Sequence, residues 1–223
     1  MEISPLLTGS PLFRGIPSEE LPALLARLEA RERRCRKGEL LLRRGERTDR
    51  LGLVLSGTVH IVREDFWGNR GIVGLAEAGD VFAESYALSG ESLEVSALAA
   101  AEVTALFLRA EPMAGTQAGT VGEARLTANL LSLLAGKNLQ LTRKMRHMAR
   151  RTTREKLLSY LSAQALAAGR AAFDIPLDRQ QLADYLAVDR SAMSAALGGL
   201  RDEGVLEFRK NHFCLLRPAE HGD

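Results

Sequence analysis

The most informative stretch of the chain is DRQQLADYLAVDRSAMSAALGGLRDEGVL, residues 178–206, because its pattern predicts two short helices joined by a tight turn. Asp178 is suited to cap the first helix, and Gln181, three residues later, completes a capping box. Residues 187–189 are expected to form the turn, from which Asp189 can cap the second helix. The apolar residues recur at helical spacing, as Leu182, Ala183 and Leu186 in the first helix and Met193, Ala196, Leu197 and Leu200 in the second. Together these features predict a helix-turn-helix.

The first turn of the second helix is polar and carries Arg190, Ser191 and Ser194. Polar side chains at the start of a second helix are what a protein needs to read base edges in the DNA major groove. The alternative is an ordinary pair of packed helices, because a motif match by itself is a hypothesis.

A short β-hairpin is expected directly after the helix pair. Gly204 ends the second helix, and residues 205–208 and 212–216 have the pattern of strands around the turn Arg209-Lys210-Asn211. A basic tip beside such a helix is suited to contact phosphate, which fixes the position of a protein on DNA without reading sequence. An ordinary solvated hairpin would carry the same two charges, so the tip supports DNA binding only together with the helices.

Length and composition fit two modest domains with sizeable cores: the chain has 223 residues, of which 46% are hydrophobic and 26% charged. The net charge of +2 does not by itself indicate nucleic acid. A basic cluster nevertheless precedes the helix pair and consists of Arg143, Lys144, Arg146, Arg150, Arg151, Arg154 and Lys156. This cluster either raises the local affinity for phosphate or forms a solvated helix face.

No apolar run approaches the roughly 20 residues needed to cross a bilayer, and the N-terminal pattern is not that of a signal peptide. We therefore expect a cytoplasmic protein without a membrane partner. Cys35 and Cys214 lack metal-binding spacing and fit a reducing compartment. Cys35 lies between Arg34 and Arg36, where its thiol is either a redox sensor or a half-buried strand residue. No Ser/His/Asp arrangement, metal cluster or phosphate-binding loop with a lysine is evident, so we predict that the protein is not an enzyme.

The N-terminal part is predicted to begin with an amphipathic helix over residues 18–34, capped by Ser18 and carrying an apolar face of Leu21, Leu24, Leu25 and Leu28. Short apolar runs separated by glycines follow, and the clearest strands are 53–55, 59–62, 72–75 and 103–108. Strands at this spacing indicate a small sandwich or barrel, with Trp67 in a hairpin between two of them. Helices and strands in separate parts of the chain give the fold class α+β.

A long helix is predicted over residues 121–148, because apolar residues recur every three or four positions as Leu126, Leu130, Leu133, Leu134, Leu141, Met145 and Met148. A helix between two domains has little of its own chain to bury this stripe against, and pairing with the same helix of a second copy would bury it. Lys137 and Gln140 interrupt the seam. Thr152 or Thr153 is expected to cap a further helix over 154–167.

The order of these parts resembles the CRP/FNR family of bacterial transcription regulators. The resemblance is carried by the spaced glycines Gly38, Gly45 and Gly57, by the run Gly79-Asp80-Val81-Phe82-Ala83-Glu84-Ser85, and by the helix-turn-helix from Arg179 to Leu206. It implies a cyclic-nucleotide-binding-like β-roll of jelly-roll type that senses an effector (1–120), a dimerisation helix (121–150) and a winged helix-turn-helix that binds double-stranded promoter DNA (151–223).

The resemblance further implies a homodimer through residues 121–148. An effector bound between the β-roll and the long helix would reorient the two DNA-binding domains, and an activator of this family would contact RNA polymerase.

The sensing region departs from the pattern of the members that bind cyclic AMP. Those members carry Gly-Glu followed further along by Arg-Ser, in which the Glu binds the ribose hydroxyl and the Arg and Ser bind the cyclic phosphate. Glu84 and Ser96 match, but Ala83 replaces the glycine and Val95 the arginine. Loss of a charge-assisted phosphate contact argues against cyclic AMP. We expect another small effector near a set of residues comprising Glu84, Ser85, Val95, Ser96 and Thr142.

The other sensing chemistries of the family fit no better. Residues 1–34 contain no cysteine for an iron–sulfur cluster, and Ser85 stands where a haem-ligating histidine would be expected. His60 is more simply an ordinary strand histidine, because a single histidine defines no site. No cofactor and no metal are therefore expected.

The DNA-reading helix also departs from the family pattern of an arginine, a nearby Glu or Ser, and a second arginine one turn later. Arg190 matches the first position, where bidentate contact with guanine is expected, whereas Ala195 occupies the position of the second arginine. Gly198 and Gly199 each lower helix propensity by about 1 kcal/mol relative to alanine. Arg179 and Gln180 match positions that bind phosphates, so the resemblance gives a DNA-contact set of Arg179, Gln180, Arg190, Ser191, Ser194, Arg209 and Lys210.

Three hypotheses remain open from the sequence. The leading hypothesis is a homodimeric regulator modulated by an effector other than cyclic AMP. In the second hypothesis the regulator binds DNA without a ligand and its β-roll is only structural. The third is an enzyme or a nucleotide-sensing allosteric module, with a degenerate nucleotide-binding roll and a helical domain that does not bind DNA.

Overall fold

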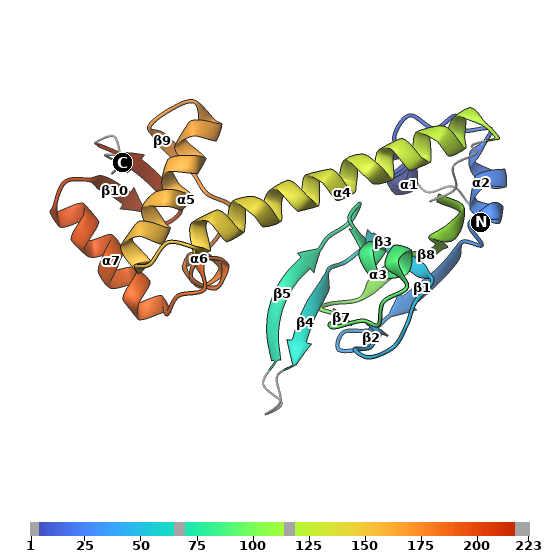
Figure 1. Ribbon diagram of the computed structural model, residues 1–223, viewed down its shortest axis with the longest axis horizontal. Helices are drawn as coiled ribbons and strands as arrows, with labels where there is room; N and C mark the ends of the chain where they lie inside the picture. Colours follow the sequence, from blue (N-terminus) through green and yellow to red (C-terminus); the bar gives the residue numbers. More distant parts are fainter. Residues whose placement is uncertain (1–4, 65–69, 114–118, 217–223) are drawn as a thin grey trace. The chain divides into compact units, whose positions relative to one another are not determined.

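The computed structural model describes residues 5–64, 70–113 and 119–216 (Figure 1). The chain divides into two compact units, Met1–Ala135 and Gly136–Asp223. The boundary falls within the longest helix, α4 (Val121–Met148), whose bounds are those predicted from the sequence. The hairpin expected around Trp67 lies outside the described residues.

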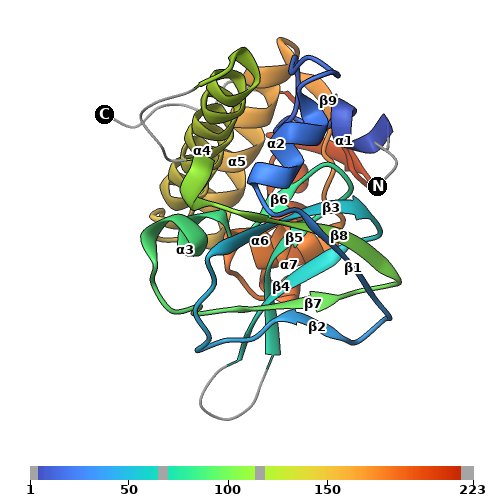
Figure 2. The ribbon, with the colours of Figure 1, turned by 90° about the vertical axis from the view of Figure 1, so that its right-hand side faces the viewer.

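Two antiparallel four-stranded sheets build the first unit (Figure 2). One has the order β1-β8-β3-β6 and is formed by β1 (Arg31–Cys35), β8 (Val103–Arg109), β3 (Arg50–Ser56) and β6 (Val81–Phe82). The other has the order β2-β7-β4-β5 and is formed by β2 (Leu40–Leu42), β7 (Ser96–Ala99), β4 (Val59–Glu64) and β5 (Arg70–Ala76). The four strands predicted from the sequence are thus confirmed as β3, β4, β5 and β8.

The central strands β3 and β8 are buried on both faces, which explains why their sequences are almost continuously apolar. One face contributes Leu51, Leu53, Leu106 and Leu108 to a cluster shared with the helices. The opposite face contributes Val54, Ala105 and Phe107 to a second cluster between the two sheets. Gly52 is required in β3 because a Cβ atom there would lie 2.2 Å from the ring of Phe82.

Short helices cover the first of these faces: α1 (Pro5–Gly9), α2 (Leu21–Arg27), α3 (Glu84–Ser89) and the 3₁₀ turn η1 (Glu111–Met113). The prediction of a helix over 18–34 is wrong at both ends. The N-cap is Glu20 rather than Ser18, and it makes no side-chain cap bond. The helix ends at Arg27, because residues 31–35 pair with β8 and bury Cys35. The predicted apolar face of Leu21, Leu24, Leu25 and Leu28 is buried as expected.

The apolar stripe of α4 behaves differently along its length. Leu126 and Leu130 are buried in the cluster that contains the leucines of β3 and β8. The expectation that α4 has little of its own chain to pack against is therefore wrong for its first turns. Further along, large apolar side chains are exposed in this chain: Leu131, Leu139, Leu141, Met145 and Met148.

The second unit continues from α4 with three helices, α5 (Thr153–Ala168), α6 (Arg179–Leu186) and α7 (Arg190–Asp202). Thr152 caps α5 in a capping box with Glu155, so the helix predicted over 154–167 is confirmed. A three-stranded sheet of order β10-β11-β9 completes the unit, with β10 (Leu206–Arg209), β11 (His212–Leu215) and β9 (Ala172–Asp174). The predicted hairpin is β10–β11, whereas β9 was not predicted.

Cys35 and His60, each considered above as a single residue, have ordinary positions in the β-roll unit. Cys35 is buried at 2% exposure, more fully than the half-buried strand position considered above, and His60 is half-buried on β4. Within the described residues, no helix is long and apolar enough to cross a membrane, and no three His, Cys, Asp or Glu side chains form a metal-binding group.

Candidate nucleic-acid interface and effector region

The helix pair α6–α7 has the caps that the sequence predicts. The Asp178 side chain accepts a hydrogen bond from the Gln181 amide, and the Gln181 side chain accepts one from the Asp178 amide. The Asp189 carboxylate accepts bonds from the amides of Ser191 and Ala192 at the start of α7. Between the helices Ala187 is left-handed, with φ 49° and ψ 58°. The turn is thus sharp enough to join two short helices without a glycine.

The N-terminal half of α7 presents one charged side chain, Arg190, which is exposed. The neighbouring serines are exposed but engaged: the Ser191 hydroxyl donates to Asp189, and the Ser194 hydroxyl donates to the Arg190 carbonyl oxygen at 2.9 Å. The Ser191 hydroxyl, followed by the two backbone amides, lowers the pKa of Asp189 and keeps the cap ionised. The serines are therefore oriented by local bonds, and Arg190 is the long side chain available for base edges.

The exposed side chains in the middle of α7, after its first turn, are small. Ala195 is exposed, and a Cβ atom added at Gly198 or Gly199 would meet nothing within 4 Å. The helix axis can therefore approach a surface more closely here than side chains would normally permit.

The hairpin β10–β11 carries Arg209 and Lys210 at its tip, both exposed. Arg179, at the first position of α6, lies with its guanidinium carbon 4.8 Å from the ring centroid of Phe208 and 5.0 Å from that of Phe213. Its Nη2 donates to the Lys210 carbonyl oxygen at 2.9 Å. Gln180 is exposed and donates to Asp184 at 2.9 Å. The structure therefore brings Arg179 to the hairpin tip, which the sequence did not indicate.

The basic cluster before α6 is partly engaged within the unit. Arg154 makes two hydrogen bonds with the carboxylate of Glu203, at 2.8 and 2.6 Å. Lys156 donates to the carbonyl oxygen of Leu186 at 3.4 Å, at the end of α6. Lys144 lies 5.3 Å from the ring centroid of Tyr185. These three cations stabilise the helix pair, so the solvated-face interpretation is too simple for them.

A buried histidine ties the end of α4 to the helix pair. His147 is 5% exposed, and its Nδ1 lies 2.8 Å from the hydroxyl oxygen of Ser159. Its ring contacts those of Tyr160 and Tyr185, at centroid distances of 5.8 and 6.5 Å. Burial lowers the pKa of His147, and the charges of two neighbouring arginines lower it further. His147 is therefore held as the neutral imidazole.

The residues expected to surround an effector lie on different elements of the structure. Glu84 is 6% exposed at the start of α3, beside the exposed Ser85. It follows Ala83, which is left-handed with φ 60° at the position where the family has glycine. Val95 is half-buried immediately before β7. Thr142 lies on the second unit's part of α4 and donates to Asn138 at 3.3 Å.

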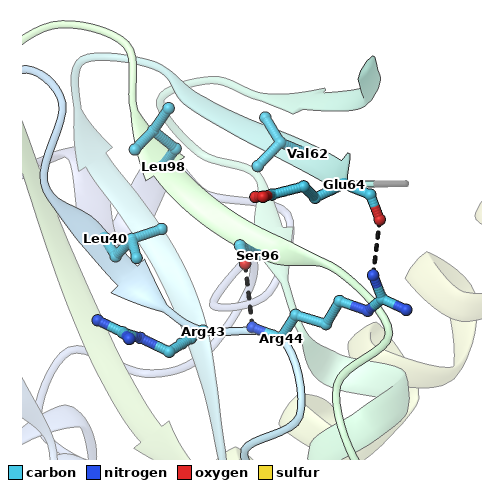
Figure 3. A pocket seen from close by; sticks show the side chains of 7 residues that line it. All are labelled: Leu40, Arg43, Arg44, Val62, Glu64, Ser96 and Leu98. Carbon is cyan, nitrogen blue, oxygen red and sulfur yellow. Dashed lines mark hydrogen bonds between the residues drawn. The ribbon is translucent and has the colours of Figure 1, made fainter. Parts of the chain in front are cut away.

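Ser96 lines a pocket with a volume of about 410 Å³, shown in Figure 3. The other lining residues are Leu40, Arg43, Arg44, Val62, Glu64 and Leu98. The Ser96 hydroxyl accepts a bond from the Arg44 amide at 3.0 Å, and the Arg44 guanidinium donates to the Glu64 carbonyl oxygen at 2.6 Å. Of the predicted effector residues, only Ser96 lines this pocket.

The pocket lies on the outer face of its sheet. Residues of β7 alternate between faces, and Ala97 and Ala99 are buried in the cluster between the two sheets. Ser96 and Leu98 therefore face the other way. The sequence did not indicate that Arg43 and Arg44 line a pocket, because their position beside Ser96 depends on strand pairing. A basic pair after a short apolar run is not a recognisable motif.

These features define a class of protein: a β-roll unit joined by a long helix to a winged helix-turn-helix unit, with a single arginine exposed at the start of the second helix. Comparison with protein-family models gives two matches, a cyclic nucleotide-binding domain over residues 32–116 and a Crp-like helix-turn-helix domain over residues 155–220. The chain belongs to the CRP/FNR family of DNA-binding transcription regulators.

Similar solved structures share this fold. One is the c-di-GMP-responsive global regulator CLP of Xanthomonas campestris, with 19% identity, coverage of 91% of this chain and 100% of that chain, and a TM-score of 0.59. Another is FixK2 of Bradyrhizobium japonicum, with 23% identity, coverage of 84% and 93%, and a TM-score of 0.53. A third is TTHA1359, a CRP/FNR-family transcriptional regulator of Thermus thermophilus, with 21% identity, coverage of 84% and 94%, and a TM-score of 0.50. No curated protein sequence matches the chain.

Proposed function

We propose that this protein is a homodimeric, sequence-specific transcription regulator that binds double-stranded promoter DNA, modulated by a small effector other than cyclic AMP. The observation that carries the proposal is the exposed Arg190 at the capped start of α7, in a unit whose hairpin presents Arg209 and Lys210. Arginine is the side chain best suited to bidentate contact with guanine, and the hairpin cations suit phosphate.

Two substitutions separate reading from positioning. A DNA sequence is first selected from a random pool with the full-length protein. Arg190→Ala should then lose about 1–3 kcal/mol of discrimination between the selected and a mismatched sequence. Arg209→Ala should weaken binding to both sequences equally and, because each copy of the dimer loses one phosphate contact, reduce the slope of log K against log salt by about 2. Equal retention of the selected and of random DNA at every salt concentration would refute sequence-specific binding, and no retention of either would refute DNA binding.

The exposed apolar residues of α4 support the homodimer. Leu131 and Met145 lie two heptads apart at the a position, and the exposed Leu141 and Met148 lie one heptad apart at the d position. Leu134, one heptad before Leu141, is half-buried and also packs against the β-roll cluster. This is the a/d pattern of a two-stranded coiled coil, and Asn138 occupies the a position between Leu131 and Met145.

Sedimentation of two aspartate variants tests this interface. Leu141→Asp should produce a monomer, because it places a charge at a d position of the seam. The matched control is Leu139→Asp, which changes a comparably exposed leucine (57% against 62%) on a different face of the helix. A dimer that survives Leu141→Asp, or that is broken equally by Leu139→Asp, contradicts the proposed seam.

The effector is proposed to bind between the β-roll and the long helix, near Glu84, Ser85, Val95 and Ser96. Val95 supports exclusion of cyclic AMP, because an apolar side chain cannot make the charge-assisted phosphate contact that an arginine makes. Thermal unfolding in the presence of each member of a panel of metabolites, with cyclic AMP and cyclic di-GMP included, tests whether the protein binds such an effector. A true effector should stabilise the protein by about 2.7 kcal/mol at 100 times its Kd. A panel without effect, together with unchanged DNA binding, favours the ligand-independent regulator.

Contact with RNA polymerase is proposed only for an activator. Transcription in vitro from a promoter that contains the selected site distinguishes the two modes, because an activator raises transcript yield whereas a repressor lowers it.

A further inference from the structure

Arg179 occupies an unusual place for a cation. It is the first residue of α6, directly after the Asp178 cap. The N-terminus of a helix carries partial positive charge, which disfavours a cation there. The guanidinium must therefore gain its interactions outside the helix.

Those interactions all lie on the hairpin β10–β11. The guanidinium stacks against Phe208 and Phe213, whose own rings lie 6.0 Å apart, and bonds to the Lys210 carbonyl oxygen. The side chain is half-buried and burial lowers its pKa, but an arginine side chain remains protonated in proteins. A planar cation can stack on rings and donate from its edge at the same time, which an ammonium group cannot do equally well.

The bonded carbonyl belongs to the most constrained residue of the tip. Lys210 has φ 53°, a left-handed conformation that is uncommon for a residue with a Cβ atom. Its carbonyl direction therefore defines the turn between Arg209 and His212. From α7, Arg201 adds a weaker contact to the same ring, at 5.5 Å from the centroid of Phe208.

We propose that Arg179 is a positioning residue that holds the hairpin tip in place, so that Arg209 and Lys210 meet DNA phosphates, and that it does not itself serve as a phosphate contact. This differs from the phosphate-contact role that the resemblance implies for Arg179. The affinity readout below rests on the proposed DNA-binding function.

The first test needs no DNA. The Ile175 amide donates to the Asn211 carbonyl oxygen at 3.0 Å, so its hydrogen exchange reports whether the tip is closed. In the full-length protein, Arg179→Ala should accelerate exchange at Ile175 at least fivefold, roughly the effect of losing one weak contact. The control Arg190→Ala removes a surface cation away from the hairpin and should leave this exchange unchanged. Unchanged exchange in Arg179→Ala overturns the proposal, whether or not the protein binds DNA.

The second test is a double-mutant cycle on the selected DNA. Arg209→Ala with Lys210→Ala removes two phosphate contacts from each copy of the dimer and should reduce the salt slope by about 4, and Arg179→Ala alone should do nearly the same. Adding all three substitutions should weaken binding no more than about twofold beyond Arg179→Ala alone, because the tip contacts are already lost. For the triple variant, a slope reduced by about 6, with losses that multiply, overturns the proposal and makes Arg179 an independent phosphate contact.

The conservative variant separates the two roles again. Arg179→Lys keeps the charge, so a phosphate contact would survive it almost intact, whereas a positioning residue would lose its stacked fork and behave like alanine. The base discrimination that depends on Arg190 should persist in every Arg179 variant. If Arg179→Ala unfolds the unit, Phe208→Leu removes the main stacking face and should show the same accelerated exchange and reduced slope.

Discussion

Replacing Ala187 by glycine is expected to stabilise the DNA-binding unit. Ala187 ends α6 with φ 49° and ψ 58°, and the left-handed conformation costs a residue with a Cβ atom about 1–2 kcal/mol. Glycine removes this cost, although the greater freedom of glycine in the unfolded chain opposes the gain by about 0.4–1 kcal/mol. The net expectation is a gain of about 0.5–1 kcal/mol in the free energy of unfolding.

Hydrogen exchange resolved by peptide during urea denaturation measures this change in the second unit separately from the β-roll unit. In a thermal scan the same gain corresponds to a rise of roughly 2–8 °C in the melting temperature of a unit of this size. DNA affinity should stay unchanged, because the methyl group of Ala187 is not among the proposed contacts.

The same chemical change at Ala195 is the matched control. Ala195 is exposed in the interior of α7, where glycine should cost about 0.5–1 kcal/mol. Opposite signs at the two positions support a left-handed turn between α6 and α7. Equal destabilisation by both substitutions would refute the reasoning, since it would mean that residue 187 gains nothing from glycine.

Three further outcomes are expected. Gly198→Ala and Gly199→Ala should each raise stability by about 0.5–1 kcal/mol, because a Cβ at either position meets nothing within 4 Å; a loss of stability in urea denaturation contradicts this. The pKa of His147 is lowered by burial, so the unfolded chain takes up a proton more readily and the unit should lose stability as pH falls below about 6.5. His147→Phe should remove that part of the dependence between about pH 7.5 and 5.5, and an undiminished dependence in calorimetry excludes His147 as its source. Finally, Cys214 should react with a thiol reagent roughly tenfold or more faster than Cys35, which is 2% exposed; comparable rates would favour the redox-sensor hypothesis.

The elements that the sequence predicted well are those set by local chemistry. The caps at Asp178 and Asp189 depend on side chains two or three residues from the amides they bond, and apolar residues recur at helical spacing over most of α4. The error at residues 31–35 has a non-local cause. These charged residues continue the helical pattern of α2, but they form a strand because they pair with β8, about 70 positions later in the chain.

The residues of the candidate DNA interface show the same difference between local and long-range causes. Arg190 was identified correctly as an exposed residue of the second helix, since its position depends only on the helix and its cap. The contacts of Arg179 were not predicted, because they join α6 to aromatic rings about 30 residues later. The strand β9 escaped prediction for the same reason: its three residues are a strand only because β11 lies beside them. Long-range pairing decides such features, and periodicity does not reveal it.

The sparse surface of α7 has an evolutionary consequence under the proposed function. Direct base preference depends on one long side chain per copy, because Ala195 and the glycine pair present no functional groups. A single codon change at Arg190 would therefore redirect the regulator to new promoters while its caps, hairpin and core stay intact. With so little information read from base identity, the spacing of two half-sites and the ease with which the intervening DNA bends become the features that distinguish one promoter from another. Mutations that lengthen or shorten a promoter between its half-sites would then matter more than most base changes inside them.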